Sequence, residues 1–148
     1  MASAEIDTLN DITKLLIDSR KGYEKAGELI GGEYTFAPEL VQRASDRAAL
    51  VAAFQARVRA LGDATETDGS ALGAAHRGFM DFTSVFRDDS KAAFSAIDDG
   101  EEYLAKKIES KLDEKNLSTE SRDLLARALA SAKSGESFAE RTEQLLKH

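Results

Sequence analysis

The chain has 148 residues, with 27 acidic and 20 basic side chains and a formal net charge of −7 at pH 7. The surplus of negative charge disfavours nucleic acid as a partner, because the phosphate backbone would be repelled. The absence of cysteine excludes disulfides, thiolate catalysis and zinc–thiolate sites. No apolar stretch approaches the roughly 20 residues that span a bilayer, and the N-terminus lacks a signal pattern. We therefore expect a cytoplasmic protein that binds neither nucleic acid nor membrane.

The composition favours helices throughout the chain. Alanine, leucine, glutamate, lysine and arginine are abundant, there is a single proline, and hairpin turn signals are scarce. A chain of this length suits one domain, so we expect residues 1–148 to share one core. The sequence therefore predicts a single all-α domain.

Two long amphipathic helices are expected in the first half of the chain. Apolar residues recur at three- and four-residue steps from about Ser3 to Ile30, and the Gly31-Gly32 pair that follows can end a helix. The second helix should begin near Pro38, since proline is tolerated in a first turn, and end at about Leu61-Gly62.

The second half should add one short helix and two long ones. A polar, turn-rich loop at 62–69 precedes a short helix at 71–86, whose His76 is more typical of a hydrogen-bonded core residue than of a metal ligand. Ser90 should cap a helix that reaches about Lys115, and Ser118 should cap a last helix that reaches Leu146. This pattern predicts a four-helix bundle with the short extra helix in the crossover.

Charged residues interrupt the apolar faces of three of these helices. Glu101 lies at the centre of one apolar stripe, while Arg20 and Arg47 lie at the centres of two others. We therefore predict a buried ionic network in the bundle. Its six expected members are Arg20, Arg47, Glu101, Glu24, Glu102 and Asp98. For Arg20 the alternative is that its aliphatic stem follows the core while its guanidinium reaches solvent.

Several short segments resemble a bacterial family of ferritin-like four-helix-bundle proteins of unknown function. They are residues 9–11 (LND), 22–26 (GYEKA), 43–47 (RASDR), 76–81 (HRGFMD) and 100–102 (GEE). The resemblance implies ferritin-like topology. It also raises the question of a di-iron site, which in such folds takes one glutamate from each of two helices and a Glu-x-x-His from each of the other two.

The ligands of such an iron site are incomplete in this sequence. No Glu-x-x-His occurs, and the only histidines are His76 and His148. The family pattern has acids near the position of Arg20 and Lys21 and a histidine near Ala139. A guanidinium can neutralise inward carboxylates as a cation does, while also donating hydrogen bonds. We therefore predict that an arginine–carboxylate network replaces the metal centre and that no cofactor is bound.

These observations favour a non-catalytic helical-bundle protein that acts in a stress-associated role through self-association, as a homodimer, or through a protein partner. The sequence offers no paired nucleophile and base and no phosphate-binding loop, so an enzyme is not expected.

Two alternatives stay open. One is a carboxylate-type iron site, because hard oxygen ligands can hold such metals without histidine. Its candidate ligands are Glu24, Glu101, Glu102, Glu140 and Glu143. The other is a small ligand or lipid bound in the core, if the small residues of the last helix leave a cavity.

Overall fold

The computed structural model describes residues 2–30, 37–62, 90–115 and 117–145, and these form helices without any strand. The helices are α1 (Ala2–Ile30), α2 (Ala37–Ala60), α4 (Ser90–Leu112) and α5 (Thr119–Leu145). The predicted all-α class is confirmed. None of the helices in this part of the chain is long and apolar enough to cross a membrane.

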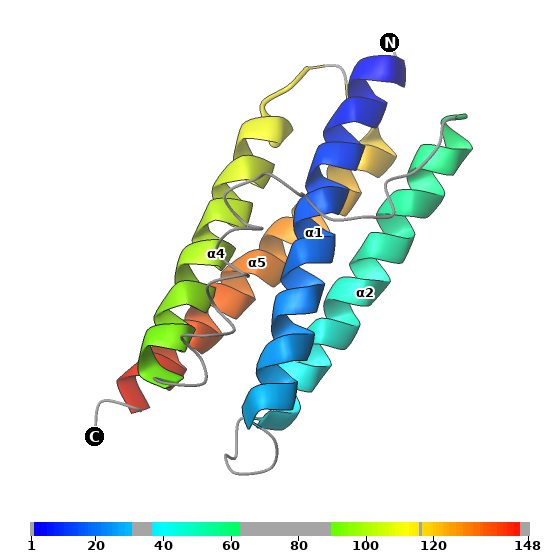
Figure 1. The fold of residues 1–148 in the computed structure, drawn as a ribbon. Coiled ribbons are helices and arrows are strands. Elements are labelled where there is room, and N and C mark those ends of the chain that lie inside the picture. The colour runs from blue at the N-terminus through cyan, green and yellow to red at the C-terminus, as the bar shows by residue number, and fades with distance from the viewer. Residues whose placement is uncertain (1, 31–36, 63–89, 116, 146–148) are drawn as a thin grey trace.

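The four helices lie side by side along one common direction (Figure 1). α1 and α2 run antiparallel and pack closely as one hairpin, and α4 and α5 do the same as a second hairpin. Contacts between the hairpins, α1 with α4 and α2 with α5, are sparser. α2 and α4 run in the same direction (Figure 1).

The helix ends follow local chemistry. Gly62 has a φ of 93°, a conformation that glycine adopts without strain, and it ends α2 where the sequence predicts. α4 ends at Leu112, three residues before the predicted Lys115. Two hydrogen bonds explain the earlier end: the Arg122 guanidinium donates to the carbonyl of Leu112 at 2.8 Å and to that of Glu114. A side chain from α5 therefore satisfies the last carbonyls of α4.

The start of α5 is capped by Ser118, as predicted, and by a residue from α1. The Ser118 hydroxyl accepts a hydrogen bond from the Ser121 amide at 3.3 Å. The Glu5 carboxylate accepts from the Ser118 amide and hydroxyl at 3.2 and 2.5 Å, and also from the Ser121 hydroxyl. Burial acts to raise the pKa of Glu5, but these hydrogen bonds and the Arg57 charge outweigh it and lower that pKa. The ionised Glu5 thus ties α1 to the start of α5.

Some predicted features lie outside the described residues. They are most of the polar loop at 62–69, the short helix at 71–86 with His76, and the residue Asn116, expected to stop the fourth helix.

A polar layer separates two apolar clusters in the core. The larger cluster takes its side chains from residues 6–17 of α1, 50–58 of α2, 104–108 of α4 and 117–132 around and within α5. The smaller takes them from 23–26 of α1, 40–44 of α2, 94–97 of α4 and 138–139 of α5. Ser19, Arg47, Glu101 and Gly135 occupy buried positions between the two clusters, one on each helix. On each of these four helices the buried apolar residues are therefore interrupted at the same level along the bundle.

Candidate functional site

Arg47 is the centre of this polar layer. Its side chain is 1% exposed, and each of the five N–H groups of its guanidinium has an acceptor. Nη1 donates to Glu101 Oε1 at 2.8 Å and to the Ser19 hydroxyl, and Nη2 donates to Glu101 Oε2 at 2.5 Å. Nε donates to the Ser131 hydroxyl at 3.0 Å, and Nη2 also reaches the Ser131 carbonyl at 3.1 Å. The arginine on α2 is thus bound to α1, α4 and α5 together.

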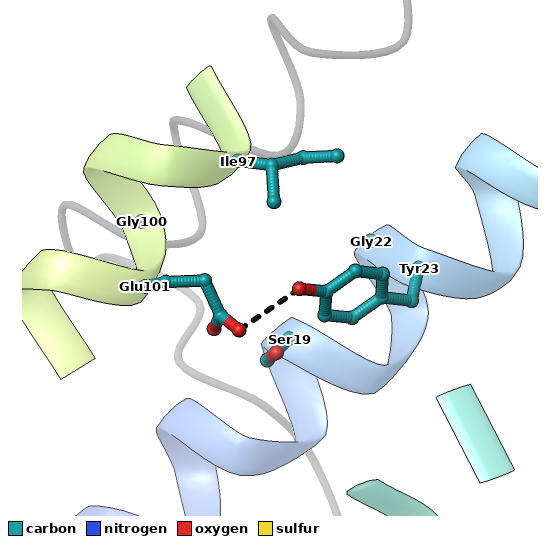
Figure 2. A pocket seen from close by; sticks show the side chains of 6 residues that line it. All are labelled: Ser19, Gly22, Tyr23, Ile97, Gly100 and Glu101. Carbon is teal, nitrogen blue, oxygen red and sulfur yellow. Dashed lines mark hydrogen bonds between the residues drawn. The ribbon is translucent and has the colours of Figure 1, made fainter. Parts of the chain in front are cut away.

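Glu101 is the carboxylate that binds Arg47 in this layer. Its two oxygens accept the paired Nη1 and Nη2 bonds of Arg47, and Oε2 also accepts the Tyr23 hydroxyl at 2.8 Å (Figure 2). The Glu101 side chain is 3% exposed. Two parallel N–H···O bonds to a carboxylate fix both orientation and charge, and such bonds are stronger than those between neutral groups. The pair is therefore a neutral, oriented unit inside the core.

The electrostatics of the layer hold this state. Burial acts to lower the pKa of Arg47, but the charge of Glu101 and the hydrogen bonds to it raise that pKa above its ordinary value. Burial, followed by the Glu101 charge, raises the pKa of Tyr23 well above 10.0. The Tyr23 ring also lies 5.5 Å from the Arg47 guanidinium carbon, within range of a cation–π contact. Around neutral pH the layer thus holds a charged Arg47 and a protonated Tyr23.

Gly135 of α5 makes room for the carboxylate. A Cβ atom built on Gly135 would lie 1.7 Å from Glu101 Oε2 and 2.7 Å from the Tyr23 hydroxyl oxygen. No side chain other than hydrogen fits at such distances. The carboxylate of Glu101 therefore packs directly on the backbone of α5.

A small cavity adjoins the carboxylate between α1 and α4 (Figure 2). Its volume is about 10 Å³, and it is lined by Ser19, Gly22, Tyr23, Ile97, Gly100 and Glu101. This volume is at the lower limit for one water molecule. Among the described residues, the arrangement thus offers a saturated ion pair and a void of water size.

The structure brings together two of the six residues expected in the buried network, Arg47 and Glu101. Arg20 is a correction, because its side chain is 32% exposed and its Nε lies 3.8 Å from Glu24, one turn along α1. Nε of Arg20 is itself buried and has no hydrogen-bond partner in the described part of the chain, so only part of the side chain reaches solvent, as in the alternative for this residue. Glu102 points to the surface, where it pairs with Lys106 at 2.7 Å. Residues next to a buried position on a helix face away from it, which explains why Glu102 does not join Glu101.

Asp98, the last expected member, lies instead in an acidic cluster with two residues of α5. Oxygens of Asp98, Glu136 and Glu140 lie within 4.8 Å of one another. Asp98 Oδ1 is buried and has no hydrogen-bond partner in the described part of the chain. Burial, followed by the charges of Glu140 and Glu136, raises the pKa of Asp98 from 3.8 to about 6. Asp98 therefore opposes folding when it is ionised, rather than balancing an arginine.

The Asp98→Asn substitution tests this electrostatic cost. Because the folded-state pKa is raised, the protonated acid is favoured by folding, and stability falls as pH rises from about 4 to about 6. At pH 7.5 the variant should be more stable than the natural protein by about 1 kcal/mol, after allowance for solvent screening at a half-buried site. At pH 4 the difference should vanish. Urea unfolding at both pH values measures it, with Asp99→Asn at the exposed neighbour as control, and an equal gain at both pH values would contradict the assignment.

The candidate iron ligands are not assembled into one site. Glu24 pairs with Arg20, Glu102 pairs with Lys106, and Glu101 is bound by Arg47 and Tyr23. Glu140 joins the acidic cluster with Asp98 and Glu136, while Glu143 is half-buried on the same helix. The donor set that a di-iron centre would need at Glu101 is thus already used by hydrogen bonds within the chain.

Four contributors to the layer were not predicted from the sequence in the roles that they take. Ser19 and Ser131 accept from Arg47, Tyr23 donates to Glu101, and Gly135 leaves space for the Glu101 carboxylate. Ser19 directly precedes Arg20, the charged residue at the centre of the predicted stripe. Ser131 directly precedes Ala132, one of the small residues of the last helix. The smallness of those residues was the available signal, because small residues let neighbouring side chains approach closely.

Comparison with known proteins places the chain in a family. A family model described as a domain of unknown function, DUF2383, matches residues 4–114. This span contains Ser19, Tyr23, Arg47 and Glu101, while Ser131 and Gly135 follow it. No curated protein and no solved structure matches the chain. Because the match covers well over half of its length, the chain belongs to the DUF2383 family of unknown function.

Proposed function

We propose that this protein is a non-catalytic, ferritin-like helical bundle that acts through self-association as a homodimer or through a protein partner, in a stress-associated cytoplasmic role. In this proposal Arg47 takes the place that a metal centre has in ferritin-like folds. The observation that carries it is the saturated Arg47–Glu101 pair at the centre of the four helices.

The direction of the helices supports the ferritin-like part of this proposal. The two antiparallel helix pairs are arranged so that α2 and α4 run in the same direction (Figure 1). In ferritin-like folds one long crossover gives the second and third bundle helices the same direction, and inward carboxylates lie on facing helices. Glu101 is one inward carboxylate of this chain, and the positive charge that faces it comes from the chain itself.

The same geometry argues against chemistry in the core. Every N–H of the buried guanidinium has an acceptor, so Arg47 has no donor left for a substrate. Tyr23 donates to Glu101, and its raised pKa keeps the hydroxyl protonated at neutral pH, so that it is not available as a general base. The adjoining cavity of about 10 Å³ is far below the several hundred Å³ of ordinary ligand pockets. Small-ligand or lipid binding at this level of the core is therefore less well supported than a structural role.

Native mass spectrometry of the untagged chain, expressed with excess iron and then dialysed, tests both halves of the proposal. We expect a dimer mass with no bound iron, because Arg47 already neutralises Glu101. A monomer mass across a wide range of protein concentrations would contradict self-association.

Retention of about two irons per chain, as in a di-iron centre, with loss on Glu101→Ala, would contradict the replacement of the metal by arginine. Iron lost on Glu136→Gln but retained on Glu101→Ala would instead point to the acidic cluster with Asp98 and Glu140. Both substitutions remove one carboxylate from α4 or α5, so each serves as the control for the other.

A further inference from the structure

An open groove lies on the outside of the polar layer, between α2 and α5. Its volume is about 460 Å³, and Ala49, Leu50 and Ala130 supply its apolar lining. Its polar lining consists of Arg43, Asp46, Arg127, Ser131 and Ser134. The groove is open because α2 and α5 belong to different hairpins and contact each other sparsely. Its volume is within the range of small-molecule sites.

The α5 wall of the groove presents hydrogen-bond donors. Arg127, Ser131 and Ser134 are spaced by four and three residues, and such residues share one face of a helix. Arg127 is exposed and forms no hydrogen bond or ion pair within the described residues. The Ser131 and Ser134 hydroxyl oxygens accept from Arg47 Nε at 3.0 Å and from Arg43 Nη2 at 3.1 Å. A hydroxyl that accepts from an N–H group keeps its own O–H to donate.

The α2 wall of the groove adds Arg43, which is fixed by hydrogen bonds, and the carboxylate of Asp46. Arg43 donates from Nε and Nη2 to Glu39 at 3.0 and 2.8 Å, and its guanidinium carbon lies 5.0 Å from the Phe138 ring centroid. These contacts fix the plane of the Arg43 guanidinium, and none of them uses the N–H groups of Nη1. Asp46 accepts from the Gln42 amide at 3.0 Å and is the one acid in the groove lining. Donors therefore outnumber acceptors in the groove, while Asp46 opposes negative charge.

We propose that this groove binds a small oxyanion ligand, a compound with a phosphate or carboxylate group. Arg127 supplies a charge that is not paired within the described residues, and Ser131 and Ser134 supply neutral donors beside it. Guanidinium and hydroxyl groups together are a common recognition set for such groups. The inference does not rest on the proposed function of the core: Ser131 also accepts from Arg47, but Arg127 and Ser134 form no hydrogen bond or ion pair with the Arg47–Glu101 pair.

The test is an amide NMR titration of the full chain, with sodium chloride added to hold the ionic strength constant. Inorganic phosphate, glycerol phosphate and acetate serve as three separate probes. We expect saturable shifts at the Ser131 and Ser134 amides with a dissociation constant on the order of 1 mM. Saturation by the phosphates alone identifies a phosphate ligand, and saturation by acetate as well identifies a general oxyanion site.

Three variants make the result specific. Arg127→Gln should weaken binding about tenfold, whereas Arg141→Gln, which removes the same charge from an exposed position of α5 outside the groove, should leave it unchanged. Asp46→Asn should strengthen binding about threefold, because it removes the opposing charge. Equal weakening by Arg127→Gln and Arg141→Gln, weaker binding by Asp46→Asn, or shifts that never saturate would each overturn the proposal.

Discussion

Replacing Arg47 with methionine should destabilise the fold by roughly 3 to 5 kcal/mol, because Glu101 would be left as an unpaired buried charge. The side chain of Glu101 is 3% exposed, so water cannot replace the lost partner. Glu101→Gln should cost a similar amount, since Arg47 would keep its charge and lose its counter-ion. The free energy of unfolding should be measured in urea by circular dichroism, because urea carries no charge that would screen the pair.

The double variant separates a mutual interaction from two independent losses. If the cost arises from a stranded charge, Arg47→Met combined with Glu101→Gln should destabilise the fold by clearly less than the sum of the two single changes. The same cycle at Arg20 and Glu24 is a matched control, because the substitutions are identical and these side chains are 32% and 56% exposed. Each control variant should cost less than about 1 kcal/mol. Small and additive effects at Arg47 and Glu101 would show that the pair does not hold the fold.

Gly135→Ala should be nearly as damaging, although it adds a single methyl group. The new Cβ would lie 1.7 Å from Glu101 Oε2 and 2.8 Å from the carboxylate carbon, so α5 must shift or the carboxylate must leave Arg47. We expect a loss of about 3 kcal/mol, within the range for overpacking combined with a disturbed buried pair. Thermal unfolding followed by circular dichroism measures it as a lowered midpoint.

Gly100→Ala on α4 is the matched control for that substitution. Both glycines lie inside helices, but a Cβ on Gly100 would meet no atom within 4 Å. Alanine is the better helix former by about 1 kcal/mol, so this variant should be as stable as the natural protein or more stable. Equal effects at the two positions would mean that helix propensity, rather than the contact with Glu101, decides the outcome.

The loss at Gly135 should also depend on its neighbours. In a chain that already carries Arg47→Met and Glu101→Gln, position 101 carries a neutral amide, and no charged hydrogen bonds hold it against the backbone of α5. Gly135→Ala should therefore cost less in that background than in the natural protein. An unchanged cost would place the strain in the helix packing alone.

Periodicity along the chain was sufficient to predict the apolar faces that are buried, but not whether a charged residue on such a face reaches the core, as Arg20 shows. The stripe that contains Phe94, Ile97 and Glu101 is buried as expected, and so is the stripe of α2 around Arg47. These predictions depend on the turn of a single helix, in which residues three and four apart share a face. The cap at Ser118 and the stop at Gly62 were also predictable, because both are satisfied by atoms a few residues away.

The tertiary structure alone decided which charges meet. Arg20 and Arg47 occupy similar positions on their stripes, yet only Arg47 reaches Glu101, because the choice depends on how far each helix is rotated and shifted against the others. Gly135, which makes room for Glu101, lies on α5 more than thirty residues after it in the sequence. Ser131, whose carbonyl accepts from Arg47, lies on the same helix more than eighty residues after that arginine. The helical period fixes the direction in which a residue faces around its helix. It does not determine how far along the axis that residue lies relative to the residues of a neighbouring helix. The partner of Glu101 was therefore settled by packing between helices, which places one polar residue from each of them at a single level of the core.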